Sequence, residues 1–195
     1  MIKKIETRQD VVKKEKRLQL ILAGILIFVL FGSVFGIVVN SFGSSQDTSK
    51  VSYNGYNFEI ENGYYTLNLG VLKFYFSFNP NEIKDLDKDF NVTRKISSYA
   101  NKEVYVSSED YSSYSEIVQN FNQYVSRTQQ ACKDGEKCLD SNLPIKTCED
   151  NLIVIKESTI NKVYENNNCI YIEGKKDDLL KLTDEFLLYE IGVNK

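Results

Sequence analysis

The sequence predicts one N-terminal transmembrane helix followed by an α+β domain, in which two main helices pack on a mostly antiparallel sheet. Three observations carry this prediction: an uncharged apolar run, an apolar/polar alternation on both sides of an Asn62-Gly63 turn, and two later stretches with apolar residues at helical spacing. Alternation is typical of strands and helical spacing of amphipathic helices. The predicted parts are a cytoplasmic basic tail (1–17), a transmembrane helix (18–40), a linker (41–50) and an extracytoplasmic α+β domain (51–195).

The membrane span is predicted by residues 18–40, which carry no charged side chain. Of these 23 positions, 16 are Leu, Ile, Val or Phe. At about 1.5 Å per residue, a helix of this length reaches roughly 34 Å, which exceeds a hydrocarbon core of about 30 Å. We therefore expect residues 18–40 to contact the lipid bilayer. Gly32 and Gly36 have the spacing of a helix-dimer face, which would give a homodimer, but glycines are also common in membrane helices without this role.

Orientation follows from the charges that flank the span. Residues 1–17 hold seven basic and three acidic side chains, whereas residues 41–48 hold one charged side chain, that of Asp47. The positive-inside rule therefore places the N-terminus in the cytoplasm and the following domain outside the cell membrane. A cleaved signal peptide is the alternative, but the apolar run exceeds the usual length of about 7–15 residues and no A-x-A-like site follows it. The exported remainder has 17 basic and 24 acidic residues, and we expect no nucleic-acid partner.

The domain opens with a predicted three-stranded meander. The Asn62-Gly63 turn joins two alternating strands, and a third strand follows over residues 71–78 until Pro80 ends it. Counting outward from the turn places three residue pairs opposite each other on one face: Ile60 and Tyr65, Phe58 and Leu67, Tyr56 and Leu69.

Further on, the pattern predicts a strand, a helix, two or three strands and a final helix. The first helix is expected over residues 114–130, begun by a capping box of Ser113 and Glu116, and the last is expected to stop at Gly192. The remaining ranges are a strand at 104–106, strands at 152–157, 161–165 and 169–173, and the last helix at 177–191.

Four cysteines predict two structural disulfides in an oxidising compartment. If strands 152–157, 161–165 and 169–173 form an antiparallel meander, two reversals bring Cys148 and Cys169 to the same end of the sheet. Cys132 and Cys138 are left to close a small ring. We expect the Cys148–Cys169 bridge to stabilise more, by on the order of 3 kcal/mol, because its loop is longer.

The catalytic inventory is nearly empty. Because the chain has no histidine, Ser-His-Asp and Cys-His catalysis and most catalytic zinc sites are excluded. The glycine motifs for phosphates and dinucleotides and the G-x-S-x-G motif are also missing. These absences favour a protein that is not an enzyme, although carboxylate-only catalysis stays open.

The sequence predicts neither a metal site nor a cofactor. The best metal candidate, Asp85-x-Asp87-x-Asp89, matches the first ligands of a calcium loop but continues with Phe90 and Ile96, where that loop needs Gly and Glu. We interpret it as a solvated acidic turn.

Two further features concern the surface. Asn91-Val92-Thr93 is a glycosylation sequon on the exported side, and such short sequons also arise by chance. The run 107–115, with Tyr105, Tyr111 and Tyr114 in or beside it, is either a binding loop or a solvated helix entry.

The overall plan resembles a type of archaeal single-pass membrane protein that has a small extracytoplasmic domain and no known activity. The resemblance lies in the basic tail, the single span, the segment YNGYNF at 53–58 and the closing segment NNCIYIEG…LLKLTDEFLLYEIGV at 167–193. It implies a membrane location and no particular reaction.

Two hypotheses for function remain. The first is a membrane-anchored extracytoplasmic binding or scaffolding domain, whose partner is an envelope protein or glycan. The second is a membrane-anchored carboxylate-dependent hydrolase that acts on envelope polymers. A cleft that holds two facing carboxylates would favour the hydrolase, and a shallow face the binding domain.

The orientation predicts which part of the chain a protease reaches. Protease added to intact cells stripped of their wall should remove the residues beyond about 45 and spare the basic tail, because the positive charges hold the tail inside. Epitopes at the two ends of the chain report the result. A protected carboxy-terminal epitope would contradict the orientation.

Overall fold

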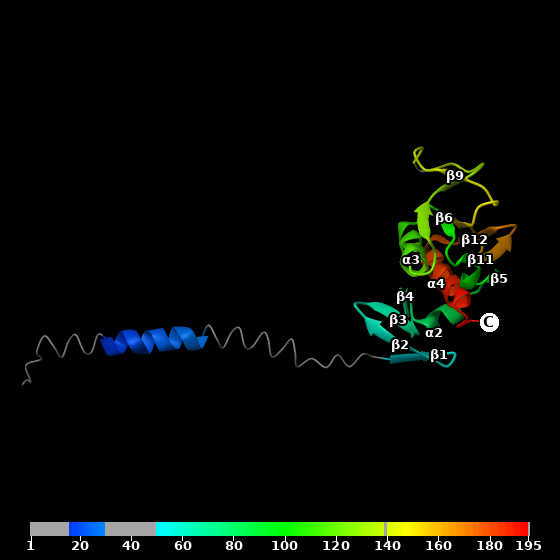
Figure 1. Cartoon of the computed structure of the whole chain (residues 1–195). Coiled ribbons are helices and arrows are strands. Elements are labelled where there is room, and N and C mark those ends of the chain that lie inside the picture. Colours follow the sequence, from blue (N-terminus) through cyan, green and yellow to red (C-terminus); the bar gives the residue numbers. More distant parts are fainter. Residues whose placement is uncertain (1–15, 30–49, 139, 195) are drawn as a thin grey trace, which may run out of the picture. The chain divides into compact units, whose positions relative to one another are not determined.

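The computed structural model describes residues 16–29, 50–138 and 140–194. The chain divides into two units, Met1–Asp47 and Thr48–Lys195 (Figure 1). In the first unit, residues 16–29 are helical, and the large apolar side chains along this helix are exposed. Among the described residues, no helix has the length and apolar character needed to cross a membrane. The predicted span continues past residue 29, so its second half, with Gly32 and Gly36, lies outside the described residues.

The second unit is an α+β domain with an antiparallel sheet, a mixed sheet and a small two-stranded sheet. The antiparallel sheet has the order β1-β2-β3-β4, with β1 at Lys50–Tyr53, β2 at Tyr56–Glu61, β3 at Tyr64–Leu69 and β4 at Leu72–Phe76. The mixed sheet has the order β5-β11-β12-β10-β6-β7, with β5 at Asp89–Asn91, β6 at Glu103–Ser108, β7 at Arg127–Gln130, β10 at Leu152–Glu157, β11 at Lys162–Asn166 and β12 at Cys169–Gly174. The small sheet pairs β8 at Cys132–Lys133 with β9 at Ile145–Lys146. The helices are α2 at Pro80–Lys84, α3 at Tyr111–Phe121 and α4 at Leu179–Glu190, with 3-10 turns η1 at Ile96–Tyr99 and η2 at Lys176–Asp178.

The antiparallel sheet agrees with the predicted meander. Ile60 lies opposite Tyr65, as the turn predicted, and Asn62 and Gly63 have φ angles of 50° and 85°. Two consecutive positive φ angles are the geometry that Asn-Gly adopts in a hairpin turn whose twist matches the strands. The sequence reading missed β1, which pairs with β2 and begins at Lys50, within the predicted linker.

The mixed sheet corrects the predicted strand order. β10 pairs with β12, in parallel, and β11 lies on the far side of β12. All three predicted strands exist and alternate in direction as predicted, and β11 and β12 pair antiparallel. The predicted pairing of 152–157 with 161–165 is wrong, because β12 lies between β10 and β11. The sequence did hold a signal for this parallel pair. Residues 152–155 and 169–172 are almost uninterrupted apolar runs, which are typical of parallel strands that are buried on both faces.

The first long helix also differs from its prediction. α3 begins after Asp110, whose carboxylate accepts the Ser113 N–H at 2.7 Å, so Asp110 is the N-cap and the Ser113–Glu116 capping box is wrong. The helix ends at Phe121, and residues 127–130 form β7 parallel to β6. The final helix is confirmed: η2 forms its first turn, and Gly192 follows α4 with a φ of 83°.

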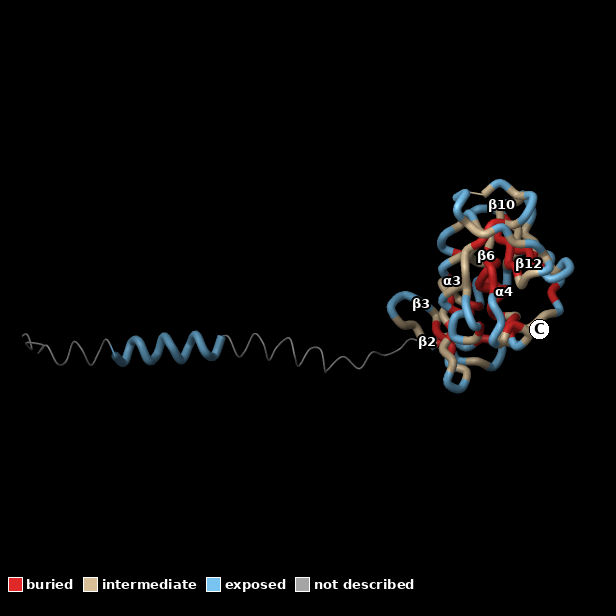
Figure 2. Tube along the Cα trace, turned by 45° about the horizontal axis from the view of Figure 1, so that its top comes forward, coloured by how far each residue is buried: buried red, intermediate tan, exposed pale blue. Residues whose placement is uncertain are grey.

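Helix α4 is the centre of the core. Nine of its twelve residues are buried, and Figure 2 colours buried residues red. It contacts α2, α3 and β12, so the two larger sheets share one hydrophobic cluster. The other face of the mixed sheet carries a smaller cluster around Tyr105, Leu152, Val154 and Tyr171.

The outer edge of β4 is closed by side chains instead of by another strand. Asn120 of α3 accepts the Tyr75 N–H and donates to the Tyr75 carbonyl, both at 2.8 Å. Gln123 does the same for Lys73, at 3.0 Å and 2.8 Å. Glu116 accepts the Ser77 N–H at 2.7 Å.

The spacing of these side chains explains the fit. Glu116 and Asn120 lie four residues apart on α3, a rise of about 6 Å, which is close to the roughly 6.8 Å between residues 77 and 75 of the extended chain. Gln123 follows in the turn after α3 and reaches residue 73. Unpaired backbone groups at a buried edge would be costly, and α3 satisfies them. This edge joins the antiparallel sheet to the rest of the domain.

Replacement of Asn120 by Ala should destabilise the domain strongly. The side chain is fully buried, and its loss leaves the N–H and carbonyl of Tyr75 without partners. We expect the free energy of unfolding to fall by roughly 2–4 kcal/mol. The neighbouring, exposed Gln119→Ala is the control and should change it by less than about 0.5 kcal/mol. Denaturant unfolding of the full-length chain in detergent measures both, and equal midpoints for the two variants would refute the role of Asn120.

Candidate ligand-binding crevice

The parallel strands bring their carboxyl ends to one edge of the mixed sheet. β7, β6, β10 and β12 are neighbours and run in the same direction. From β6 the chain continues through α3 to β7 on one side, whereas from β10 it continues to β11 and β12 on the other side. The gap between the ends of β6 and β10 is therefore a topological switch point, the place where sheets of this kind bind ligands.

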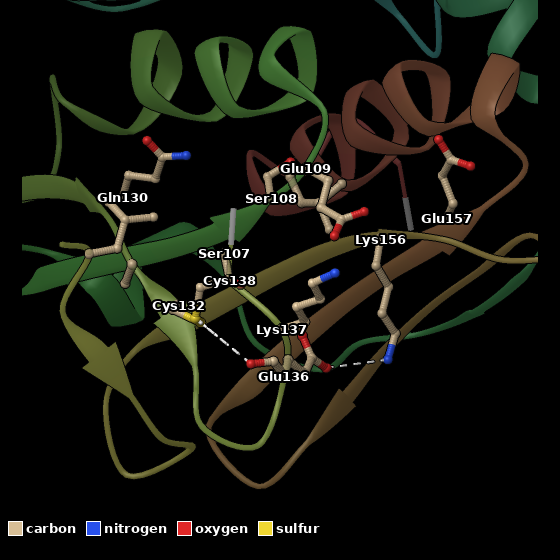
Figure 3. Close-up of a pocket in the computed structure, with 13 residues that line it drawn as sticks. Ser107, Ser108, Glu109, Gln130, Cys132, Glu136, Lys137, Cys138, Lys156 and Glu157 are labelled. Atoms are coloured by element: carbon tan, nitrogen blue, oxygen red, sulfur yellow. Dashed lines mark hydrogen bonds and ion pairs between the residues drawn. A yellow bond between two sulfur atoms is a disulfide. The ribbon is translucent and has the colours of Figure 1, made fainter. Parts of the chain in front are cut away.

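A crevice of about 380 Å³ lies at this switch point (Figure 3). Residues 107–109 line it from the end of β6, and residues 155–157 from the end of β10. Gln130 and the loop around Cys132 and Cys138 complete the wall. Its volume falls within the range of roughly 300–1,000 Å³ that is typical of small-molecule sites.

The wall of the crevice depends on a disulfide. Cys132 and Cys138 are bridged, with Cα atoms 5.7 Å apart, and close the loop that carries Glu136 and Lys137. The Cys132 N–H donates to the Pro144 carbonyl at 2.9 Å. A loop with few apolar residues is thus held in place by a covalent bond and a short sheet.

The second disulfide joins Cys148 to Cys169, with Cα atoms 4.9 Å apart, so the predicted pairing of all four cysteines is confirmed. As predicted, two reversals of the chain bring the starts of β10 and β12 to the same end of the sheet. The two strands are also direct neighbours, and Leu152 lies directly beside Cys169. Two disulfides indicate an oxidising, extracytoplasmic compartment.

The charged groups of the crevice are largely paired. Lys156 Nζ lies 3.5 Å from Glu136 Oε1 and 3.3 Å from Glu173 Oε1. Burial lowers the pKa of Lys156, but the hydrogen bonds and charges of Glu173 and Glu136 outweigh burial and leave this pKa raised. Figure 3 shows Lys156 reaching toward Glu136, with Glu109 and Glu157 at other points of the rim. The crevice therefore offers hydroxyl, amide and paired ionic groups, which suit the recognition of a polar ligand.

The strongly perturbed carboxyl groups lie elsewhere, on α4. Burial raises the pKa of Asp184 well above its ordinary value, and the neighbouring carboxyl group of Glu116 raises it further. The protonated form of Asp184 is therefore favoured, and its Oδ2 accepts the Phe78 N–H at 2.9 Å. Glu116 and Asp184 hold the backbone that follows β4, and neither lines the crevice.

The other residues singled out from the sequence do not gather at one site. Asn91 is exposed at the end of β5. Across residues 50–138 and 140–194, no three acidic or cysteine side chains are grouped as metal ligands, so Asp85, Asp87 and Asp89 form no such cluster. Tyr105 is buried on the far side of the mixed sheet, whereas Tyr111 is exposed, so the two do not form one binding loop.

The sequence singled out part of the crevice wall, namely Cys132, Cys138 and residues 107–109 of the run 107–115. It did not predict Lys156 and Glu136, which carry no motif and lie 20 positions apart.

Comparisons with known proteins identify no relative: no family model, no curated protein and no solved structure matches this chain.

The buried carboxyl group of Glu190 should make the stability of the fold depend on pH. It is 2% exposed, its two oxygens have no hydrogen-bond partner among the described residues, and burial raises its pKa to about 8, against the opposing charges of Lys95 and Arg94. A raised pKa means that the folded state favours the protonated form. The contribution of Glu190 to the free energy of unfolding is therefore fully present below its ordinary pKa of 4.5, and it is lost as the pH rises through about 8.

Glu190→Gln, a neutral analogue of the protonated acid, should remove part of this loss. The quantity to follow is the free energy of unfolding of the variant minus that of the natural chain. We expect this difference to increase from pH 5 to pH 9, because these two pH values lie on either side of the pKa of about 8. Denaturant unfolding at a series of pH values measures the difference, and the exposed Glu82→Gln serves as the control. A difference that does not vary with pH would rule out a titrating Glu190.

Proposed function

We propose that this protein is a membrane-anchored extracytoplasmic binding domain, and that its crevice takes a polar group of an envelope protein or glycan. The observation that carries the proposal is the position of the crevice at the switch point of the parallel strands, with a wall closed by a disulfide. The apolar run 18–40, the basic tail before it and the exposed apolar side chains of helix 16–29 support the anchor.

The charges of the crevice favour binding over hydrolysis. Glycoside hydrolysis needs two carboxyl groups roughly 5–9.5 Å apart that face a substrate. Glu136 is engaged by Lys156 and Lys133. The acids with raised pKa values, Asp184, Glu185 and Glu190, are buried on α4 and do not line the crevice. The hydrolase thus lacks an observation in its favour.

Site-specific crosslinking tests the proposal in intact cells that express the full-length chain. A photoreactive residue at Glu109, on the crevice rim, should give a discrete adduct with an envelope component, because a bound ligand lies beside it. The same residue at Val71, fully exposed on the β3–β4 turn, is the control and should give none. Mass spectrometry identifies the adduct. Equal labelling at both positions, or no adduct at Glu109, would refute a ligand in the crevice.

A second measurement separates binding from hydrolysis. Envelope polymers incubated with the purified full-length chain should release no soluble fragments. If fragments are released, and if Glu109→Gln or Glu157→Gln abolishes their release, the protein is a hydrolase and the binding proposal is wrong.

A further inference from the structure

A second cavity, of about 220 Å³, lies between the β2–β3 hairpin and the first turns of α3. Tyr64 lines it from the start of β3, and Leu180 from the start of α4. Most of its remaining wall comes from one face of α3. It shares no lining residue with the crevice, so it is a separate site.

Its clearest feature is a pair of exposed tyrosines. All 13 tyrosines of the chain lie within the described residues, and only Tyr64 and Tyr111 are exposed, at 40% and 79%. Both line this cavity, although they come from different elements. Exposed aromatic rings that converge on one pocket are typical of recognition sites, since the ring can contribute contact area at a small cost in conformational entropy.

The groups between the tyrosines are polar and uncharged. Ser112, Ser115 and Gln119 lie three and four residues apart and share one face of α3. The one charged lining residue, Glu116, is buried and already accepts hydrogen bonds from the N–H and the hydroxyl of Ser77. No lysine or arginine lines the cavity. A negatively charged ligand would therefore meet a carboxylate and no cation, and a wholly apolar ligand would meet the two tyrosine rings and one leucine but would leave the serine hydroxyls and the amide unpaired.

We infer that this cavity is a recognition site for a neutral sugar residue. A pyranose ring presents polarised C–H groups on its faces, which are attracted to the electron-rich face of a tyrosine, and hydroxyl groups at its rim, which suit serine hydroxyls and a planar amide. The volume is below the roughly 300–1,000 Å³ of drug-sized sites, so it fits one sugar unit while the rest of a glycan extends into solvent. This inference does not depend on a ligand in the crevice.

Titration of the full-length chain with neutral oligosaccharides tests the site. The chain is kept in a detergent without a sugar head group, and a panel of glucose, galactose, mannose and N-acetylglucosamine oligomers is added. Isothermal titration calorimetry measures binding, because 11 of the 13 tyrosines lie outside the cavity and would dominate tyrosine fluorescence. We expect saturable binding of at least one neutral series, weakened at least tenfold by Tyr111→Ala and by Gln119→Ala. Tyr111→Phe, which keeps the ring, should retain most of the affinity.

Controls separate this site from the crevice. Lys156→Ala alters the crevice and should leave sugar binding unchanged, as should Val71→Ala on the exposed β3–β4 turn. Circular dichroism checks that each variant is folded, which we expect because Tyr111 and Gln119 are exposed. The inference is overturned if no neutral series binds, if binding survives Tyr111→Ala, or if Lys156→Ala abolishes it.

Discussion

The domain depends on the polar contact between helix α3 and the edge of β4. Asn120 and Gln123 imitate a neighbouring strand, each by accepting one backbone N–H and donating to one carbonyl. Without this contact, the antiparallel sheet would end in an open edge and its aromatic face would separate from α4. The same helix also lines the cavity that holds Tyr64 and Tyr111.

The same junction explains the buried acids. Glu116 and Asp184 accept the N–H groups of residues 77 and 78, where β4 ends and no strand follows. Two carboxyl groups in one buried site cannot both ionise cheaply, so Asp184 holds its proton and the pair costs less. Raised pKa values often mark catalytic groups, but here they have a structural cause that is visible in the hydrogen bonds.

The two candidate sites arise from different physics. The crevice follows from strand direction, because parallel strands that diverge at β6 and β10 leave a gap at their carboxyl ends. The loop over this gap is held by the Cys132–Cys138 bridge and not by a core of its own. The smaller cavity lies where the start of β3 meets α3 and the start of α4, and aromatic and hydroxyl groups line it. The first suits polar and ionic recognition, and the second suits an uncharged ring.

The sequence by itself determined the features that neighbouring residues encode. The hairpin at Asn62-Gly63 and the final helix up to Gly192 could be predicted, because turn chemistry, helical spacing and capping act over a few residues. The cysteine pairing could be predicted from the alternating directions of three successive strands. Only the tertiary structure decided that β10 pairs with β12, that Glu116 serves β4 instead of its own helix, and that Lys156 meets Glu136. These contacts depend on which surfaces are buried against each other. Burial is a property of the whole domain and cannot be predicted from a short stretch of sequence.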